Sequence, residues 1–158
     1  MENREYLWVI DNCVYYTSIE ESCYNKDYRF ARILLNGILE YCQNRICLND
    51  EIEKELKKFQ NKKKQSAYFE FFQDWYSEMH YRNKFKIVQQ YKPLETDLEI
   101  HRKDLKYFKT AFNTKDRILV ACEEEHLIMR DKISEELEVE VLSIKEASER
   151  IFSLNKKK

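Results

Sequence analysis

The chain contains very little glycine and proline: Gly37 and Pro93 are the only two in 158 residues. A single glycine excludes the glycine-rich loops that bind phosphate in mononucleotide and dinucleotide folds. No apolar stretch approaches the roughly 20 residues that a membrane-spanning helix needs, and the apolar run near the N-terminus is too short for a secretory signal. We therefore expect a cytoplasmic protein with no membrane partner.

Neither sign of charge dominates. The sequence has 28 Lys and Arg against 29 Asp and Glu, for a net charge of −1, so no global basic field indicates nucleic-acid binding. A neutral protein can still carry a local basic groove. Because 29 carboxylates are present, most must be ordinary surface charges, and only their positions can identify candidates for a site.

The cysteines form no C-x-x-C pair, and their number, five, is odd. This spacing gives no zinc motif. Four of them lie in or beside apolar segments, where a reduced thiol packs as a small apolar side chain. These four are Cys13, Cys42, Cys47 and Cys122. We expect reduced thiols throughout, in agreement with a cytoplasmic location.

Two apolar runs without polar alternation stand out, at 6–10 and 117–122. Such runs predict strands that are buried on both faces, which is typical of parallel sheets. Shorter strands are expected at 45–48 and 139–142, whereas segment 85–91 allows no assignment. The length predicts one domain over 1–154, followed by a basic tail at 155–158.

Helical periodicity fills the intervals between these strands. Helices are expected at about 26–43, 66–82, 97–112, 124–137 and from 144 onward, with another after Asn49 that carries Ile52, Leu56 and Phe59 on its apolar face. Residues 14–23 are expected to form a short helix or a turn. Asn49 and Thr96 can cap two of them, and Ser143 with Glu146 has capping-box spacing. Strands that alternate with helices predict an α/β fold, in which helices flank a central parallel sheet in three layers.

The segment at about 60–82 is unusually aromatic. Tyr68, Phe72, Trp75 and Met79 share one face of the expected helix. One interpretation is a helix of the hydrophobic core. The alternatives are a homodimer face or a platform on which bases stack.

Four acidic residues occupy positions at which a carboxylate is costly. Asp11 and Glu123 directly follow the two apolar runs, and ligands bind beyond the carboxyl ends of parallel strands. Glu55 and Asp104 fall on the inward edges of their expected helices. Singly, each can be a capped or paired acid. Together they predict a cation site, because two carboxylates about 5 Å apart repel by roughly 3 kcal/mol at an effective dielectric constant near 20. Oxygen ligands favour Mg²⁺ or Mn²⁺.

Four short motifs and their order give the chain a resemblance to a known family. They are Val9-Ile10-Asp11-Asn12-Cys13-Val14, Asn49-Asp50-Glu51-Ile52-Glu53-Lys54-Glu55-Leu56, Asp104-Leu105 with Ala111 seven residues after the acid, and Leu119-Val120-Ala121-Cys122-Glu123. In this order the chain resembles the PIN domain, a parallel α/β fold of metal-dependent ribonucleases. The strand at 139–142 and the capped helix after it resemble the end of that domain.

The resemblance implies a function and a site. It implies hydrolysis of RNA phosphodiester bonds with Mg²⁺ or Mn²⁺, with Asp11, Glu55, Asp104 and Glu123 as the metal ligands and catalytic residues. Such enzymes include toxins of toxin–antitoxin pairs and defence nucleases, so a protein antitoxin or inhibitor is an expected partner beside RNA. The cations available to the RNA backbone are Lys54, Lys57, Lys58, Arg102 and Lys103, and the simpler interpretation of each is solvated surface.

The chain departs from the family pattern at two positions. Cys13 stands where the family commonly has Asn, and Glu123 where it has Asp, which leaves Glu124 as a rival fourth acid. These departures motivate an alternative, a catalytically silent PIN-like module that binds RNA or a protein partner. His101 is expected either to pack at a helix edge or to contact a phosphate.

Overall fold

The central sheet is the feature that positions everything else. The computed structural model describes residues 4–20, 27–41, 43–62, 67–89 and 92–156. Its strands are β1 (Tyr6–Ile10), β2 (Asn44–Leu48), β3 (Phe85–Ile87), β4 (Ile118–Val120) and β5 (Glu140–Leu142). All neighbours pair in parallel, in the order β3-β2-β1-β4-β5. The carboxyl ends of β1 and β4 are therefore adjacent, although the two strands lie far apart in the sequence.

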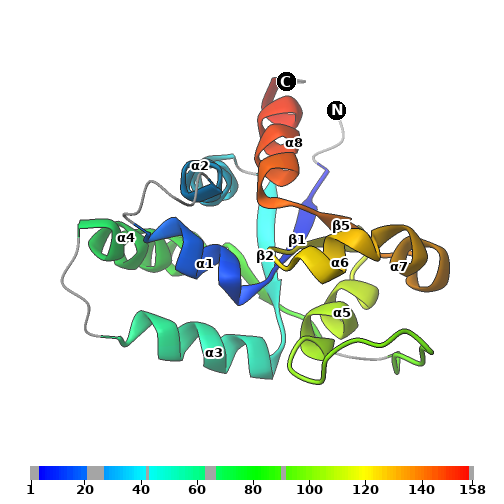
Figure 1. Ribbon diagram of the computed structural model, residues 1–158. Helices are drawn as coiled ribbons and strands as arrows, with labels where there is room; N and C mark the ends of the chain where they lie inside the picture. The colour runs from blue at the N-terminus through cyan, green and yellow to red at the C-terminus, as the bar shows by residue number, and fades with distance from the viewer. Residues whose placement is uncertain (1–3, 21–26, 42, 63–66, 90–91, 157–158) are drawn as a thin grey trace.

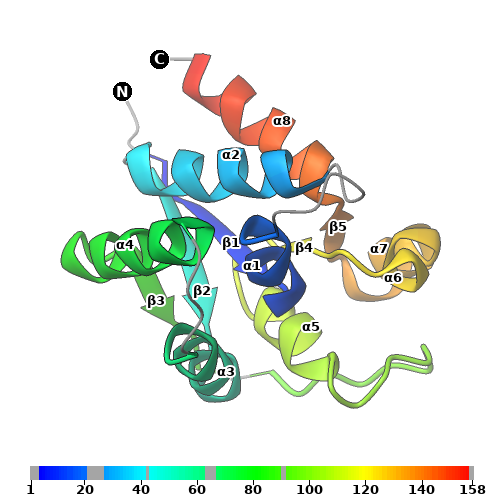
Figure 2. The same cartoon turned by 60° about the vertical axis from the view of Figure 1, so that its left-hand side comes forward.

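Helices cover both faces of this sheet. Those in the described residues are α1 (Asn12–Ser18), α2 (Asp27–Glu40), α3 (Asp50–Gln60), α4 (Ala67–Tyr81), α5 (Leu105–Phe112), α6 (Glu124–Ile128), α7 (Arg130–Leu137) and α8 (Ile144–Lys156). Figures 1 and 2 show α1, α2 and α4 on one side of the sheet and α5 and α7 on the other, with α8 packed along α2. The predicted three-layer α/β fold with a central parallel sheet is confirmed. Within the described residues, no helix is long and apolar enough to cross a membrane.

Strand β1 lies at the centre of the sheet and is buried on both faces, as its apolar run predicts. From Leu7 to Ile10 no residue is more than 4% exposed. The Trp8 indole nitrogen donates a hydrogen bond of 2.8 Å to the side-chain oxygen of Asn44 on β2, so burial of this large ring leaves no polar atom unpaired. The ladder continues one residue beyond the strand, where the Asp11 N–H donates to the carbonyl of Val120 at 3.0 Å. Asp11 is thereby fixed at the carboxyl edge.

Two of the predicted helix starts are confirmed by their caps. The Asn49 side-chain oxygen accepts the Ile52 N–H at 2.8 Å at the start of α3. Before α8, Ser143 and Glu146 form a reciprocal capping box, in which each side chain accepts the other's N–H at 3.1 Å. Both helices therefore begin where the sequence places them.

The aromatic helix α4 belongs to the hydrophobic core. Phe72, Trp75 and Met79 are each at most 2% exposed, and the Trp75 indole nitrogen donates to the Leu35 carbonyl at 2.8 Å. Tyr68 lies at the surface instead, with the Arg32 guanidinium 3.6 Å from its ring centre. The prediction that this helix belongs to the hydrophobic core is therefore confirmed for Phe72, Trp75 and Met79.

The helix predicted over 97–112 is wrong in its first half. Helix α5 begins only at Leu105, and the preceding segment is irregular. Local side-chain bonds hold that segment: the Thr96 hydroxyl accepts the Leu98 N–H at 3.1 Å, and His101 Nδ1 accepts the Lys103 N–H at 3.2 Å. Such bonds compete with the helical pattern. Thr96 is therefore not a helix cap.

Two further expectations need adjustment. The helix expected over 124–137 is divided at Met129 into α6 and α7. The ambiguous segment 85–91 contributes β3, the short strand at one edge of the sheet. Neither change moves the carboxyl ends of β1 and β4.

Candidate metal centre

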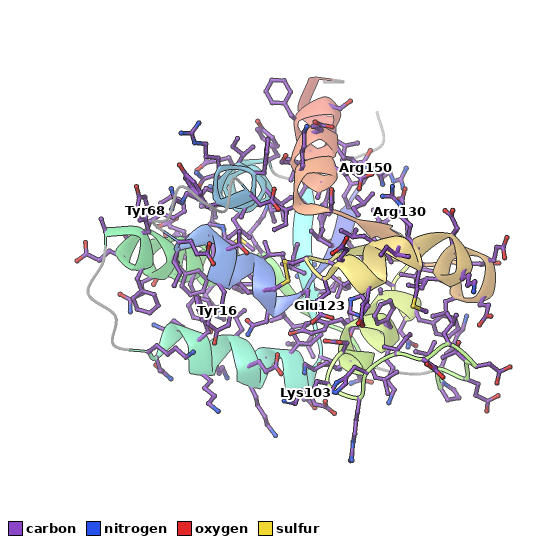
Figure 3. The ribbon with its side chains drawn as sticks, viewed as in Figure 1. Tyr16, Tyr68, Lys103, Glu123, Arg130 and Arg150 are labelled. Carbon is purple, nitrogen blue, oxygen red and sulfur yellow. A yellow bond between two sulfur atoms is a disulfide. The ribbon has the colours of Figure 1, made fainter. Side chains whose placement is uncertain are left out.

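Two carboxylates and one imidazole converge beside the carboxyl end of β4. Asp104 and Glu123 directly precede α5 and α6, and His126 lies in α6. One donor atom from each lies within 4.8 Å of the others. Figure 3 shows Glu123 near the middle of the molecule, where the chain enters α6, with Lys103 from the segment before α5 below it. The group thus joins two chain segments that meet only through the fold.

The two acids of this group form no ion pair with a lysine or arginine in the described part of the chain. Among the described residues, the only ionisable partner of each acid is His126. Its Nε2 atom lies 3.6 Å from an oxygen of Asp104 and 3.7 Å from an oxygen of Glu123. Neither carboxylate caps the helix that follows it. The Asp104 side chain is 14% exposed and that of Glu123 is 50% exposed, so a cation from solvent can reach both.

Asp11 lies beside this group in a more buried position. It is 7% exposed, and its side chain accepts the Cys13 N–H at 3.2 Å, which caps α1. The pKa of Asp11 is raised from 3.8 to about 6: burial raises it most, that hydrogen bond lowers it, and the carboxylates of Asp104 and Glu123 add to the rise. The three acids therefore share one electrostatic environment, in which a divalent cation would relieve their repulsion.

Glu55 is held differently. Its carboxylate is paired with the Lys106 ammonium at 2.5 Å and accepts the Tyr107 hydroxyl hydrogen bond at 2.7 Å. The Tyr107 oxygen in turn accepts the Asn12 N–H at 3.2 Å, and burial raises the pKa of Tyr107, so its proton stays in place. Glu55 therefore contacts the centre through a tyrosine, and a lysine already neutralises its charge.

The predicted residues thus have different surroundings. Asp104 and Glu123 come together, Asp11 lies next to them, and Glu55 is separated by its own cation. Glu124 is exposed and lies outside the group. His101 is exposed rather than packed at a helix edge.

His126 was missed by the sequence analysis. Its one local signal is the spacing from Glu123: three residues on a helix place both side chains on one face. That spacing is common by chance, so only the convergence with Asp104 makes it informative.

A disulfide joins the two strand ends that carry the acids. Cys13 and Cys122 are bonded, so the expectation of reduced thiols is wrong for these two, whereas Cys47 is free and buried as expected. Cys23 and Cys42 lie outside the described residues. Because β1 and β4 are neighbours, Cys13, two residues after Asp11, and Cys122, directly before Glu123, come within bonding distance. This contact cannot be read from local spacing.

Removal of this disulfide should destabilise the protein. It closes a loop between residues 109 apart in the sequence, and loop-closure entropy for about 100 residues corresponds to about 4–5 kcal/mol. We expect the Cys13→Ser/Cys122→Ser variant to lose free energy of unfolding of this order in urea titrations. Dithiothreitol should lower the midpoint of the wild type and leave that of the variant unchanged. Equal wild-type midpoints with and without the reductant would contradict a stabilising disulfide.

A groove of about 520 Å³ lies between segment 97–99 and helices α6 and α7, and none of Asp104, Glu123 and His126 lines it. Its charged lining consists of three acids, Asp97, Glu99 and Glu125, and one base, Lys132. The excess of negative charge in this groove repels phosphate. Two exposed bases, Arg102 and Lys103, instead directly precede Asp104 in the sequence.

Comparison with family models, with curated proteins and with solved structures finds no match for this chain.

Proposed function

We propose that the protein is a divalent-metal-dependent endoribonuclease. The observation that carries this proposal is the convergence of Asp104 and Glu123, unpaired by any described Lys or Arg, beside the buried Asp11 at the carboxyl edge of a parallel sheet. That is the edge at which ligands of parallel α/β folds bind. The resemblance of the sequence motifs to the PIN domain supplies the substrate class, RNA.

The donor set fits a divalent cation. The carboxylates of Asp104 and Glu123 would hold it, and the neighbouring Asp11 would add negative charge to the site. Bound there, a divalent ion lowers the pKa of a coordinated water and stabilises negative charge on a phosphate. We expect either Mg²⁺ or Mn²⁺ to support the reaction, since both accept carboxylate oxygens.

The RNA backbone would approach from the side of the basic residues. Arg102 and Lys103 are exposed and adjoin Asp104, and Lys54 and Lys58 are exposed on α3. Lys57 is engaged by Glu53 at 3.1 Å, so it is the weaker candidate. Cations placed next to an acidic centre offset the repulsion between that centre and phosphate.

A cleavage assay tests the proposal. A fluorescently labelled single-stranded RNA is incubated with the purified protein and Mn²⁺ or Mg²⁺, with EDTA as the matched control, and a DNA of the same sequence is run in parallel. We expect internal cuts in RNA that require the metal. RNA that stays intact over a range of sequences at millimolar metal would contradict the nuclease.

Because Glu55 is already paired with Lys106, its substitution should weaken Mn²⁺ binding less than substitution of Glu123 does. Glu55→Gln should change Mn²⁺ affinity by less than about threefold, because Lys106 already neutralises that carboxylate. Glu123→Gln should weaken Mn²⁺ binding at least about 10-fold, because it removes an unpaired donor. Isothermal calorimetry of both variants checks this order. Equal losses would place Glu55 among the direct ligands.

A second candidate is a catalytically silent module that binds RNA or a protein partner. The ion pair between Glu55 and Lys106 favours it, because one of the four predicted acids already has a partner. Calorimetry with Mn²⁺ separates the two functions: the silent module predicts no binding at millimolar concentration. Retained RNA binding without cleavage would support it.

The remaining partners and the location are further proposals. A protein antitoxin or inhibitor would cover the mouth of the acidic centre. Homodimer formation stays a prediction, and only Tyr68 and Tyr81 of the aromatic helix are exposed tyrosines that could serve it. The cytoplasmic location also stays a prediction, and the disulfide makes cell fractionation a useful test, because disulfides are rare in reducing compartments.

A further inference from the structure

His126 is a buried polar side chain for which the described residues supply no hydrogen-bond partner. The residue is 5% exposed, and its ring packs edge-on against Phe108, with ring centres 5.1 Å apart. Its Nδ1 atom is buried and unpaired among the described residues. Leaving such a group unpaired costs about 1–3 kcal/mol. A strong interaction at the other ring nitrogen would offset that cost.

The other nitrogen, Nε2, lies between the two carboxylates of the centre. It is 3.6 Å from an Asp104 oxygen and 3.7 Å from a Glu123 oxygen, too far for hydrogen bonds, which are about 2.7–2.9 Å in charged pairs. Ligand atoms that share one ion at about 2.1 Å are themselves about 3.0–3.4 Å apart in octahedral or tetrahedral arrangements. The observed spacing is closer to that of a shared ion.

We propose that Nε2 of His126 is a direct ligand of the metal centre, and that the centre takes a first-row transition-metal ion in preference to Mg²⁺. Two carboxylates alone would suit Mg²⁺ and Mn²⁺ equally. An imidazole nitrogen shifts the preference, because Mg²⁺ is held by oxygen ligands whereas transition-metal ions accept nitrogen. This inference rests on the proposed site and not on RNA cleavage.

Pulsed electron paramagnetic resonance with Mn²⁺ as the probe tests the proposal. Protein labelled with ¹⁵N-histidine should show a ¹⁵N coupling to bound Mn²⁺ in the wild type. The coupling should vanish in His126→Gln and persist in His80→Gln, a matched control in which an exposed histidine of α4 is replaced. Calorimetry should give at least about 10-fold weaker Mn²⁺ binding for His126→Gln, with Mg²⁺ binding changed less than about threefold.

Several results would overturn the proposal: bound Mn²⁺ without nitrogen coupling, coupling that survives His126→Gln, or no Mn²⁺ binding. If His126→Gln does not fold, the double variant His80→Gln/His101→Gln decides the assignment, because His126 is then the one histidine left of the three in the sequence. Nitrogen coupling in a protein that cleaves no RNA would uphold this inference and reject the nuclease. Cleavage without coupling would do the reverse.

Discussion

Replacing Asp104 with Asn is expected to lower the rate of Mn²⁺-dependent RNA cleavage at least about 100-fold, the scale on which losing one preorganised electrostatic contact to a reacting group acts. The amide keeps the shape of the side chain but removes the negative charge that would hold the cation. Asp104 caps no helix through its side chain and has no Lys or Arg partner among the described residues. The loss should therefore appear in activity and not in stability.

The matched control is Glu124→Gln, which removes an exposed acid next to Glu123 from outside the converging group. It should retain cleavage within about threefold of the wild type, because a solvated surface charge contributes little. Thermal unfolding of both variants separates folding from function. Wild-type cleavage by Asp104→Asn would remove the acid from the site, and a large loss in Glu124→Gln would make Glu124 the fourth acid instead.

Replacing Asp11 with Asn is expected to stabilise the metal-free protein by about 3 kcal/mol at pH 7.5. The pKa of Asp11 is raised from 3.8 to about 6 by burial, and each unit corresponds to about 1.4 kcal/mol. The asparagine side-chain oxygen can still accept the Cys13 N–H, so the cap of α1 is retained. Activity should nevertheless fall with metal affinity, so stability and function should change in opposite directions.

The direction of the pH effect follows from which state binds the proton more tightly. Below about pH 4, Asp11 is protonated in both states and costs nothing. Between about pH 4 and 6 the unfolded chain releases the proton first, so stability is lost as the pH rises, and above about pH 6 the loss is complete.

Urea unfolding in EDTA at pH 4.5 and 7.5 measures this directly. The advantage of Asp11→Asn over the wild type should be small at the lower pH and near its full value at the higher one. Saturating Mn²⁺ should reverse the order at pH 7.5 by stabilising the wild type. An Asp11→Asn protein less stable than the wild type in EDTA at pH 7.5 would contradict the raised pKa.

The sequence predicted best what depends on local pattern. A short apolar run without alternation is typical of a strand buried on both faces of a parallel sheet, so β1 and the position of Asp11 at its end could be predicted. The capping residues Asn49, Ser143 and Glu146 were identifiable for the same reason, since each bonds within three residues of itself. Parallel pairing then placed Glu123 at the same edge as Asp11.

What escaped prediction depends on contacts between distant segments. The ion pair of Glu55 with Lys106 joins α3 to α5, and the disulfide joins residues 109 apart. His126 becomes a candidate ligand only beside Asp104, from another part of the chain. The start of α5 was misplaced because side-chain bonds of Thr96 and His101 favoured an irregular segment that periodicity does not reveal.

The most direct measurement is anomalous diffraction from a crystal soaked in Mn²⁺, recorded near the manganese absorption edge. If the proposed centre exists, we expect a peak between Asp104, Glu123 and His126, about 2.0–2.3 Å from a donor atom of each. A protein that shows no peak there, or binds Mn²⁺ only at other surface carboxylates, would contradict the proposed centre.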